Sequence, residues 1–306
     1  MTTLHYCYNH LYTDTLDNIV EQYISRCNTD TLPHIVKKVD TAKKIKTNKQ
    51  TLPTEEISDH YVFNKQNINI GHYVHKFIHF YYRWLQNKKK ILYYSFDDTF
   101  KDSFFTSVFT DKYITFQKPD TVYTLINCSE AYYTGRNLQS IPDYISIVKD
   151  IRDKCFSYYN IQPNRTLTVL YDRNDVQKKN IKNIDTTFLH TNNIVHISDL
   201  ITGFTFKETL RLLSQTKKFI IPVGAGCFNY IFLDTTSQVF EINPHAPNSW
   251  ARQFGLYKMV DRHIIYVSNN TEKCMTATQQ YGGDDHIIFD KKLLKVLSKQ
   301  FNLINT

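Results

Sequence analysis

The stretch KFIIPVGAGCFNYIF, residues 218–232, runs from an apolar segment through two glycines into a second apolar segment. The first segment has the character of a buried strand, and the second begins a helix. Gly224 and Gly226 lie at the junction between them. In a doubly wound sheet, such a junction lies at the carboxyl ends of the strands, where ligands bind. The stretch therefore predicts an α/β fold with a ligand site beside these glycines.

Phosphate is the ligand that suits this junction. The glycines would let the backbone approach a phosphate closely, and the free N–H groups at the start of the helix would point at it. The predicted phosphate contacts are Gly224, Ala225, Gly226, Cys227, Phe228 and Asn229. The structural alternative is a tight strand-to-helix turn in which glycine serves only close packing, and a lone Gly-x-Gly does not decide between the two.

Strand and helix patterns alternate through the C-terminal half. Short apolar runs predict strands at 167–170, 194–197, 219–222, 239–242 and 264–267. Helical periodicity predicts helices at 206–214, from Ser249 and, with amphipathic character, at 291–301. Such alternation predicts a parallel sheet with helices on both faces.

The N-terminal half shows the same alternation. The patterns predict helices at 72–85, 98–108 and 144–159, and strands at 91–94 and 121–126. A polar segment around Pro163 breaks the last helix, and we place the domain boundary there. We predict two Rossmann-like domains, 1–162 and 163–306, that face each other across a cleft. The terminal helix is expected to pack back on the N-terminal domain.

Composition and charge narrow the choice of partners. The chain has 306 residues, 42% of them hydrophobic and 22% charged, which is typical of a folded globular protein. A formal net charge of +8 favours anionic partners such as nucleic acids and sugar nucleotides. The densest basic stretch, 35–49, has no aromatic residue interleaved for base stacking, which favours a solvated surface over a nucleic-acid patch. No nucleic-acid-binding motif is recognisable, so we expect no nucleic-acid partner. The net charge and the basic tracts nevertheless keep a basic nucleic-acid-binding protein as the rival function.

The cysteines and apolar runs indicate the compartment. Six cysteines are scattered without close pairs, which favours reduced thiols. Neither a signal peptide nor an apolar run long enough for a membrane span is recognisable. We therefore expect a cytoplasmic protein. The heavy use of Asn, Lys, Ile and Tyr is typical of AT-rich genomes, including those of large DNA viruses, and carries no functional information.

Several short motifs occur in a fixed order along the chain. The chain reads YDRNDVQKKNIKN at 171–183, VGAG at 223–226, Asn229, and VFEINP at 239–244. These residues resemble glycosyltransferase family 61, which shows a strand ending in Arg and a basic tract closing with Ile-x-Asn. The family then shows His-Gly-Ala-Gly, an Asn, and a strand ending in hydrophobic-Glu-hydrophobic-x-Pro. Weaker matches are Asn-Ile-Gly-His at 69–72 and Gly-Leu-Tyr at 255–257. The resemblance therefore spans about 69–257 and leaves 1–60 outside.

The resemblance implies a GT-B-like fold and a sugar-transfer activity. The donor would be a nucleoside-diphosphate sugar, namely a UDP-sugar carrying a hexose or pentose. The acceptor would be a hydroxyl of a glycan or glycoprotein, with inversion at the anomeric carbon. No cofactor is implied, and no Asp-x-Asp motif suggests a metal site. Val223 stands where the family usually has His, and Lys76 where an acidic residue is common. These departures keep open the alternative of an inactive glycan-binding relative.

Donor-binding roles follow from the matched blocks. Arg173 at the end of a strand is the first candidate for a fork-shaped phosphate contact, supported by Lys178 or Lys179. Its alternative is a surface ion pair with Asp172 or Asp175. Asn183 closes the same block and joins the predicted donor set.

Glu241 is the last residue of the predicted donor set. It emerges at the same sheet edge and could accept hydrogen bonds from ribose hydroxyls. Its alternative is a structural carboxylate that pairs with Arg252.

His72 is the candidate catalytic base for the acceptor hydroxyl. A near-neutral imidazole suits proton abstraction. The apolar positions of the helix that it opens predict that its side chain faces the cleft. The alternative is a structural histidine, because His75 and His79 lie on the same helix and together form a His-rich face.

Overall fold

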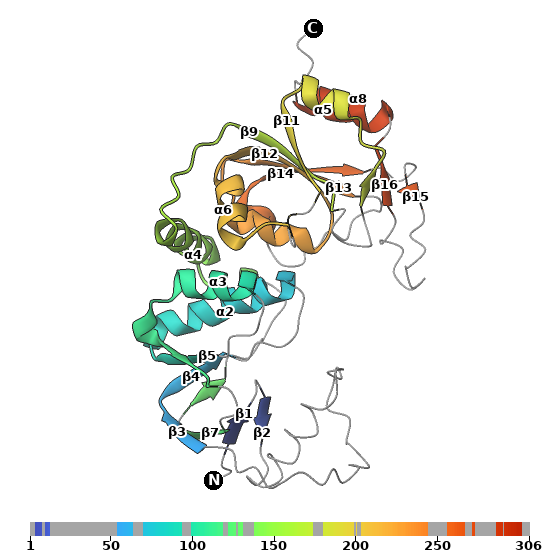
Figure 1. The fold of residues 1–306 in the computed structure, drawn as a ribbon. Helices are drawn as coiled ribbons and strands as arrows, with labels where there is room; N and C mark the ends of the chain where they lie inside the picture. Colours follow the sequence, from blue (N-terminus) through green and yellow to red (C-terminus); the bar gives the residue numbers. More distant parts are fainter. Residues whose placement is uncertain are drawn as a thin grey trace, which may run out of the picture. The chain divides into compact units, whose positions relative to one another are not determined.

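Each of the two parts of the chain contains one fully parallel sheet and one mixed sheet (Figure 1). The computed structural model describes residues 4–7, 10–12, 54–63, 70–93, 99–118, 122–126, 128–130, 138–173, 180–198, 200, 203–243, 256–266, 271–272, 286–289 and 291–301. Unit 1 comprises Met1–Asn67, Arg83–Asp97 and Phe109–Tyr132, and unit 2 comprises Ile68–Tyr82, Asp98–Val108 and Tyr133–Thr306. Pro163 lies inside unit 2, and a domain boundary at this residue stays a prediction.

Unit 1 contains two four-stranded sheets. One has the order β6-β5-β4-β8, with all strands parallel: β4 (His60–Phe63), β5 (Lys90–Tyr93), β6 (Ile114–Phe116) and β8 (Ser129–Glu130). The other has the order β2-β1-β7-β3: β1 (Leu4–Cys7), β2 (His10–Tyr12), β3 (Thr54–Ser58) and β7 (Val122–Ile126). The pairs Ser58–Ile126 and Tyr61–Ser129 keep one parallel register from the second sheet into the first. Val62, Leu92 and Tyr123 form a small buried cluster there.

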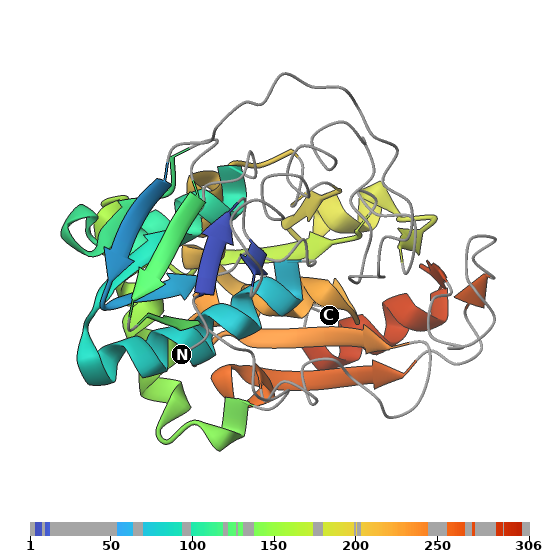
Figure 2. The same ribbon diagram turned by 90° about the horizontal axis from the view of Figure 1, so that it is seen from below.

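Unit 2 is built on a five-stranded parallel sheet. Its order is β11-β9-β12-β13-β14: β9 (Leu167–Tyr171), β11 (Ile194–Ile197), β12 (Thr216–Pro222), β13 (Gln238–Asn243) and β14 (Asp261–Tyr266). Its orange strands point the same way in Figure 2. If the five strands are numbered along the chain, their order across the sheet is 2-1-3-4-5. The direction in which strands are added therefore reverses between β9 and β12. This is the topological switch point of a doubly wound sheet. A short sheet, β10-β16-β15, adds Ile181–Lys182, His286–Ile288 and Thr271–Glu272.

One face of this sheet is covered by α5 (Thr186–Thr191) and α8 (Lys291–Phe301), which lie together in Figure 1. Leu293 and Leu297 of α8 are buried in one cluster with Leu170 and Phe240 of the sheet. The buried leucines of this helix therefore cover the C-terminal sheet, because the strand residues on that face need an apolar cover. That the helix also packs back on the N-terminal domain stays a prediction.

The other helices of unit 2 form an aromatic-rich layer. It contains α3 (Thr99–Val108), α4 (Tyr144–Tyr158), α6 (Phe206–Ser214) and the 3-10 helix η3 (Ala225–Phe232). Both α3 and η3 contact α4 and α6. The ring of Phe104 lies 5.5 Å from that of Phe206 and 5.6 Å from that of Phe232. Phe77 of α2 (Ile70–Asn87) reaches the same cluster, with its ring centroid 4.4 Å from that of Phe104. These contacts fix η3 within its layer.

Local sequence explains where these helices begin and end. Thr205 and Glu208 form a reciprocal capping box, which starts α6 at the predicted residue. The predicted apolar positions of α2, namely Phe77, Phe80, Tyr81 and Trp84, are all buried. Within the described ranges, short 3-10 helices also span Asp111–Tyr113, Leu138–Ser140 and Leu256–Met259. The helix predicted from Ser249 lies outside the described residues. No helix in the described part of the chain is both long and apolar enough to span a bilayer.

Candidate functional site

The switch point of unit 2 brings together two of the predicted segments. Arg173 follows the carboxyl end of β9, and Gly224 follows that of the neighbouring strand β12. The Arg173 Nη1 donates a hydrogen bond of 3.0 Å to the backbone oxygen of Val223. Ligands of doubly wound sheets bind in the crevice at this position. The two segments that the sequence assigned to phosphate are thus in direct contact.

Gly224 has a conformation that requires glycine. Its φ of 146° and ψ of −160° lie in a region that residues with a Cβ rarely adopt. A Cβ at this position would also overlap Nη1 of Arg173. Gly226 has a packing role, because a Cβ there would lie 2.9 Å from Cδ1 of Ile221. Gly226 is therefore tightly packed and Gly224 makes room for the arginine, while the phosphate contact of both glycines stays a prediction.

The segment after the glycines is a 3-10 helix, which corrects the expected pattern of free amides. The Cys227 N–H already donates to the Gly224 oxygen at 3.0 Å. Phe228 and Asn229 follow inside η3, where the i→i−3 pattern employs the amides as well. The expectation of a free amide at Cys227 was wrong, because a 3-10 helix closes its first hydrogen bond one residue earlier than an α-helix. In a 3-10 helix that starts in this way, the amides without a partner inside the helix are those of Ala225 and Gly226.

Arg173 is a buried cation without a carboxylate partner among the described residues. Its residue is 7% exposed, and its φ is 60°, in the left-handed region. The Nε atom has no hydrogen-bond partner in the described structure. A buried charge without a counter-ion costs free energy. A bound anion would compensate this charge, and the phosphate-binding role of Arg173 stays a prediction.

The ion pair expected as the alternative for Arg173 is not formed with Asp172. The Asp172 carboxylate instead accepts from His196 Nε2 at 2.8 Å and from Ser198 at 3.1 Å. Asp175, the other expected partner, lies outside the described residues. His196 was not among the residues predicted from the sequence. Its position near the end of β11, at the same sheet edge, was the available signal.

Asn229, which lies in η3, is like Arg173 a buried polar residue. Its residue is 0% exposed, and neither its amide oxygen nor its amide nitrogen has a partner within the described structure. Phe228 packs with its ring centroid 6.2 Å from that of Phe100, which is a core contact. Burial, together with the nearby Glu241, raises the pKa of the Cys227 thiol to about 12, so this cysteine is a neutral packing residue.

Glu241 lies at the centre of a buried polar network. Its residue is 0% exposed, Oε2 accepts from Tyr230 at 3.0 Å, and both oxygens accept from Arg262 at 3.0 and 3.2 Å. These contacts favour the structural alternative for Glu241, with Arg262 as the paired arginine. Arg252, the expected partner, lies outside the described residues.

The other predicted site residues are either exposed or lie wholly or partly outside the described residues. Asn183 is exposed just after β10, with a φ of 58°. Lys178 and Lys179 lie outside the described residues, as does the side chain of Ala225. His72 is in the first turn of α2, and its side chain is likewise outside the description, so its catalytic role stays a prediction.

The histidines next to His72 are buried in α2. The rings of His75 and His79 lie 5.0 Å apart, edge to face. Lys76 is also buried. The His-rich face that the sequence suggested is therefore largely an interior face of the helix.

Comparison with known families decides the affiliation of the chain. The family described as Glycosyltransferase 61 matches residues 8–240, which is well over half of the sequence. The chain belongs to this family. A search of curated proteins found no match. Family membership indicates a glycosyltransferase that acts on a sugar donor and an acceptor, and it carries no information on a viral origin.

The extent of the match corrects the expected limits. It begins at residue 8, although we had placed 1–60 outside the resemblance. None of the short motifs that carry the resemblance lies in that segment. The match ends at Phe240, immediately before Glu241.

Proposed function

We propose that this chain transfers a sugar from a nucleoside-diphosphate sugar, namely a UDP-sugar, to a hydroxyl of a glycan or glycoprotein. The observation that carries this proposal is the buried Arg173, which has no carboxylate partner among the described residues and touches the glycine turn at the switch point. Family membership supports the transferase class. We further propose inversion at the anomeric carbon and a hexose or pentose as the sugar.

The chemistry requires neutralisation of a departing diphosphate. The acceptor oxygen attacks the anomeric carbon, the bond from that carbon to the phosphate oxygen breaks, and the bonding electrons leave with the diphosphate. In our proposal the Arg173 guanidinium and the open amides of Ala225 and Gly226 balance this charge. The hydroxyl proton passes to a base, for which we propose His72. The paired state of Glu241 makes us omit a ribose contact from this scheme.

We also propose the finer architecture. The two parallel-sheet units are compatible with Rossmann-like domains, and the proposed arrangement is that of a GT-B enzyme with a cleft between them.

The free thiols of Cys128, Cys155 and Cys227 support a reducing, cytoplasmic site of action. The alternative of an inactive glycan-binding relative is favoured by Val223, a buried apolar residue in place of the histidine usual in the family. Measured turnover of any UDP-sugar would exclude this alternative.

The proposed phosphate contact predicts the effect of Arg173→Ala. The substitution removes a charge-assisted hydrogen bond, so the binding of UDP should weaken by about 1.5 to 3 kcal/mol. Isothermal calorimetry on the folded variant measures this difference. Arg211→Ala on the exposed side of α6 is the control and should bind UDP like the wild type. Equal affinity of the Arg173 variant and the wild type would contradict the assignment.

The lack of an Asp-x-Asp motif predicts metal-independent turnover. Arg173 and the turn amides supply the positive charge in this proposal, so EDTA should leave the rate of sugar transfer unchanged. The assay compares initial rates before and after dialysis against EDTA. A complete loss of activity that Mg²⁺ or Mn²⁺ restores would refute this part of the proposal.

A further inference from the structure

We propose that Tyr230 and Arg262 are positioning residues that act through Glu241 to hold the glycine turn 224–226 in its binding geometry. This inference rests on the proposed function of the turn as a diphosphate site. Neither residue belongs to the predicted donor set. Both are connected to the glycine turn through buried contacts with Glu241 or Cys227.

The fixed point of the network is the Glu241 carboxylate. It lies on β13, between β12 and β14, and thus inside a sheet in which both neighbouring strands are paired in register. Arg262 on β14 contacts both carboxylate oxygens, and Tyr230 donates to Oε2. A buried carboxylate that gave up Arg262 would be left with an uncompensated charge, and one that gave up Tyr230 would lose a buried hydrogen bond. Both losses cost free energy, so these two contacts hold the carboxylate in place.

Tyr230 lies in η3, so its hydrogen bond to Glu241 connects this helix to the carboxylate. Gly224 is the N-cap residue of that helix, and the Cys227 N–H closes the first turn onto the Gly224 oxygen. The Cys227 Sγ lies 3.5 Å from the Tyr230 hydroxyl oxygen, so the first turn and the tyrosine are in direct contact. Any displacement of Tyr230 is consequently transmitted to the glycine turn.

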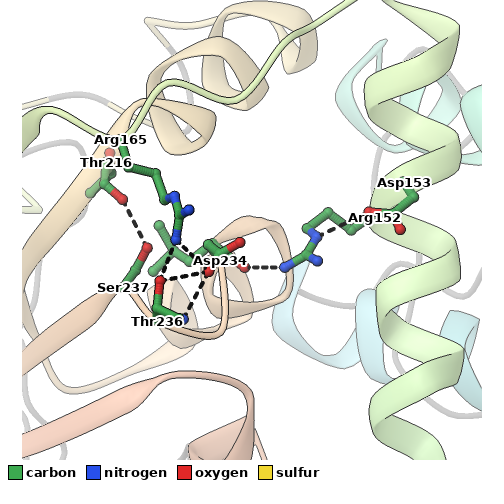
Figure 3. Close-up of polar contacts among 8 residues, drawn as sticks. Arg152, Asp153, Arg165, Thr216, Asp234, Thr236 and Ser237 are labelled. Carbon is green, nitrogen blue, oxygen red and sulfur yellow. Dashed lines mark hydrogen bonds and ion pairs between the residues drawn. The ribbon is translucent and has the colours of Figure 1, made fainter.

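The far end of η3 is anchored separately. Arg152 of α4, labelled in Figure 3, donates through Nη1 to the Leu233 oxygen at 2.6 Å, at the C-cap of the helix. A 3-10 helix has poorer hydrogen-bond geometry than an α-helix and is uncommon at this length. External anchors at the middle and the end explain why these eight residues keep the conformation. Of the two anchors, the Tyr230–Glu241 bond is the one beside the glycine turn.

A test should remove this bond and leave the packing intact. Tyr230→Phe deletes only the hydroxyl, and we expect UDP binding to weaken about 5- to 10-fold, because the turn amides are less well preorganised. The matched control is Tyr81→Phe, which removes another tyrosine–carboxylate bond, from Tyr81 to Asp150 at 2.5 Å, between α2 and α4. The control should lose stability and keep the affinity of the wild type. Calorimetry well below both melting temperatures separates affinity from folding.

Hydrogen exchange provides a readout that needs no ligand. In Tyr230→Phe the hydrogen-bonded amides of residues 227–229, which follow the glycine turn, should exchange faster, while those of β12 and β13 stay protected as in the wild type. Unchanged exchange at residues 227–229 would overturn the positioning role, whether or not UDP binds. If the wild type binds no UDP, the proposed function fails, and the exchange experiment still decides whether Tyr230 fixes the turn. Wild-type affinity in Tyr230→Phe would likewise overturn the inference.

Discussion

His72→Ala should lower the turnover of sugar transfer by about two to four powers of ten and leave UDP affinity nearly unchanged. The reason is that a general base contributes to the transition state of the proton transfer and makes no contact with the nucleotide. A base acts only in its neutral form, so wild-type turnover should also fall on acidification. Steady-state kinetics across a pH series, with calorimetry of UDP binding, measure both effects.

The control for this substitution is another histidine of the same unit. His190 lies in the last turn of α5 and is exposed, so His190→Ala should keep wild-type turnover. If His72→Ala retains full turnover, the base is a different residue. If the wild type shows no turnover with any UDP-sugar, the inactive relative becomes the correct description.

Arg262→Ala should lower the free energy of unfolding by about 3 to 5 kcal/mol, because it leaves the Glu241 carboxylate buried without its cation. The bidentate contact is almost completely shielded from solvent, so water cannot replace the guanidinium. Chemical denaturation of the variant and the wild type measures the difference.

An exposed ion pair in the same unit provides the matched control. Arg165 pairs with Asp234 at 2.7 Å (Figure 3), and their side chains are 42% and 32% exposed. Arg165→Ala should therefore cost only about 0 to 1 kcal/mol. If the two arginine variants lose the same small amount of stability, the Glu241 network is not the buried anchor described above.

The alternation of strands and helices was predictable because the period of the apolar residues is a local property. The helix 206–214 and the strand 194–197 have the predicted limits, since a capping box starts the former. The packing partner of α8 was not predictable. An amphipathic stripe shows that a helix is covered, but the surface that covers it depends on the tertiary structure.

The candidate site was predictable in part for a similar reason. The contact of Arg173 with the glycine turn follows from the parallel order of β9 and β12, which the motifs anticipate. The 3-10 geometry of η3 was missed, because its apolar sequence also suits an α-helix. The partner of Glu241 was missed as well: Arg262 is set by the pairing of β13 with β14, and a nearby arginine in sequence was an equally good choice.

Calorimetric titration of the wild-type protein with UDP and with uridine tests the central claim most directly. The switch-point arginine and the glycine turn are assigned to the diphosphate, so UDP should bind and uridine should bind much more weakly. Equal affinities for UDP and uridine, or no binding of UDP to the folded protein, would contradict the claim that this site holds a nucleoside diphosphate.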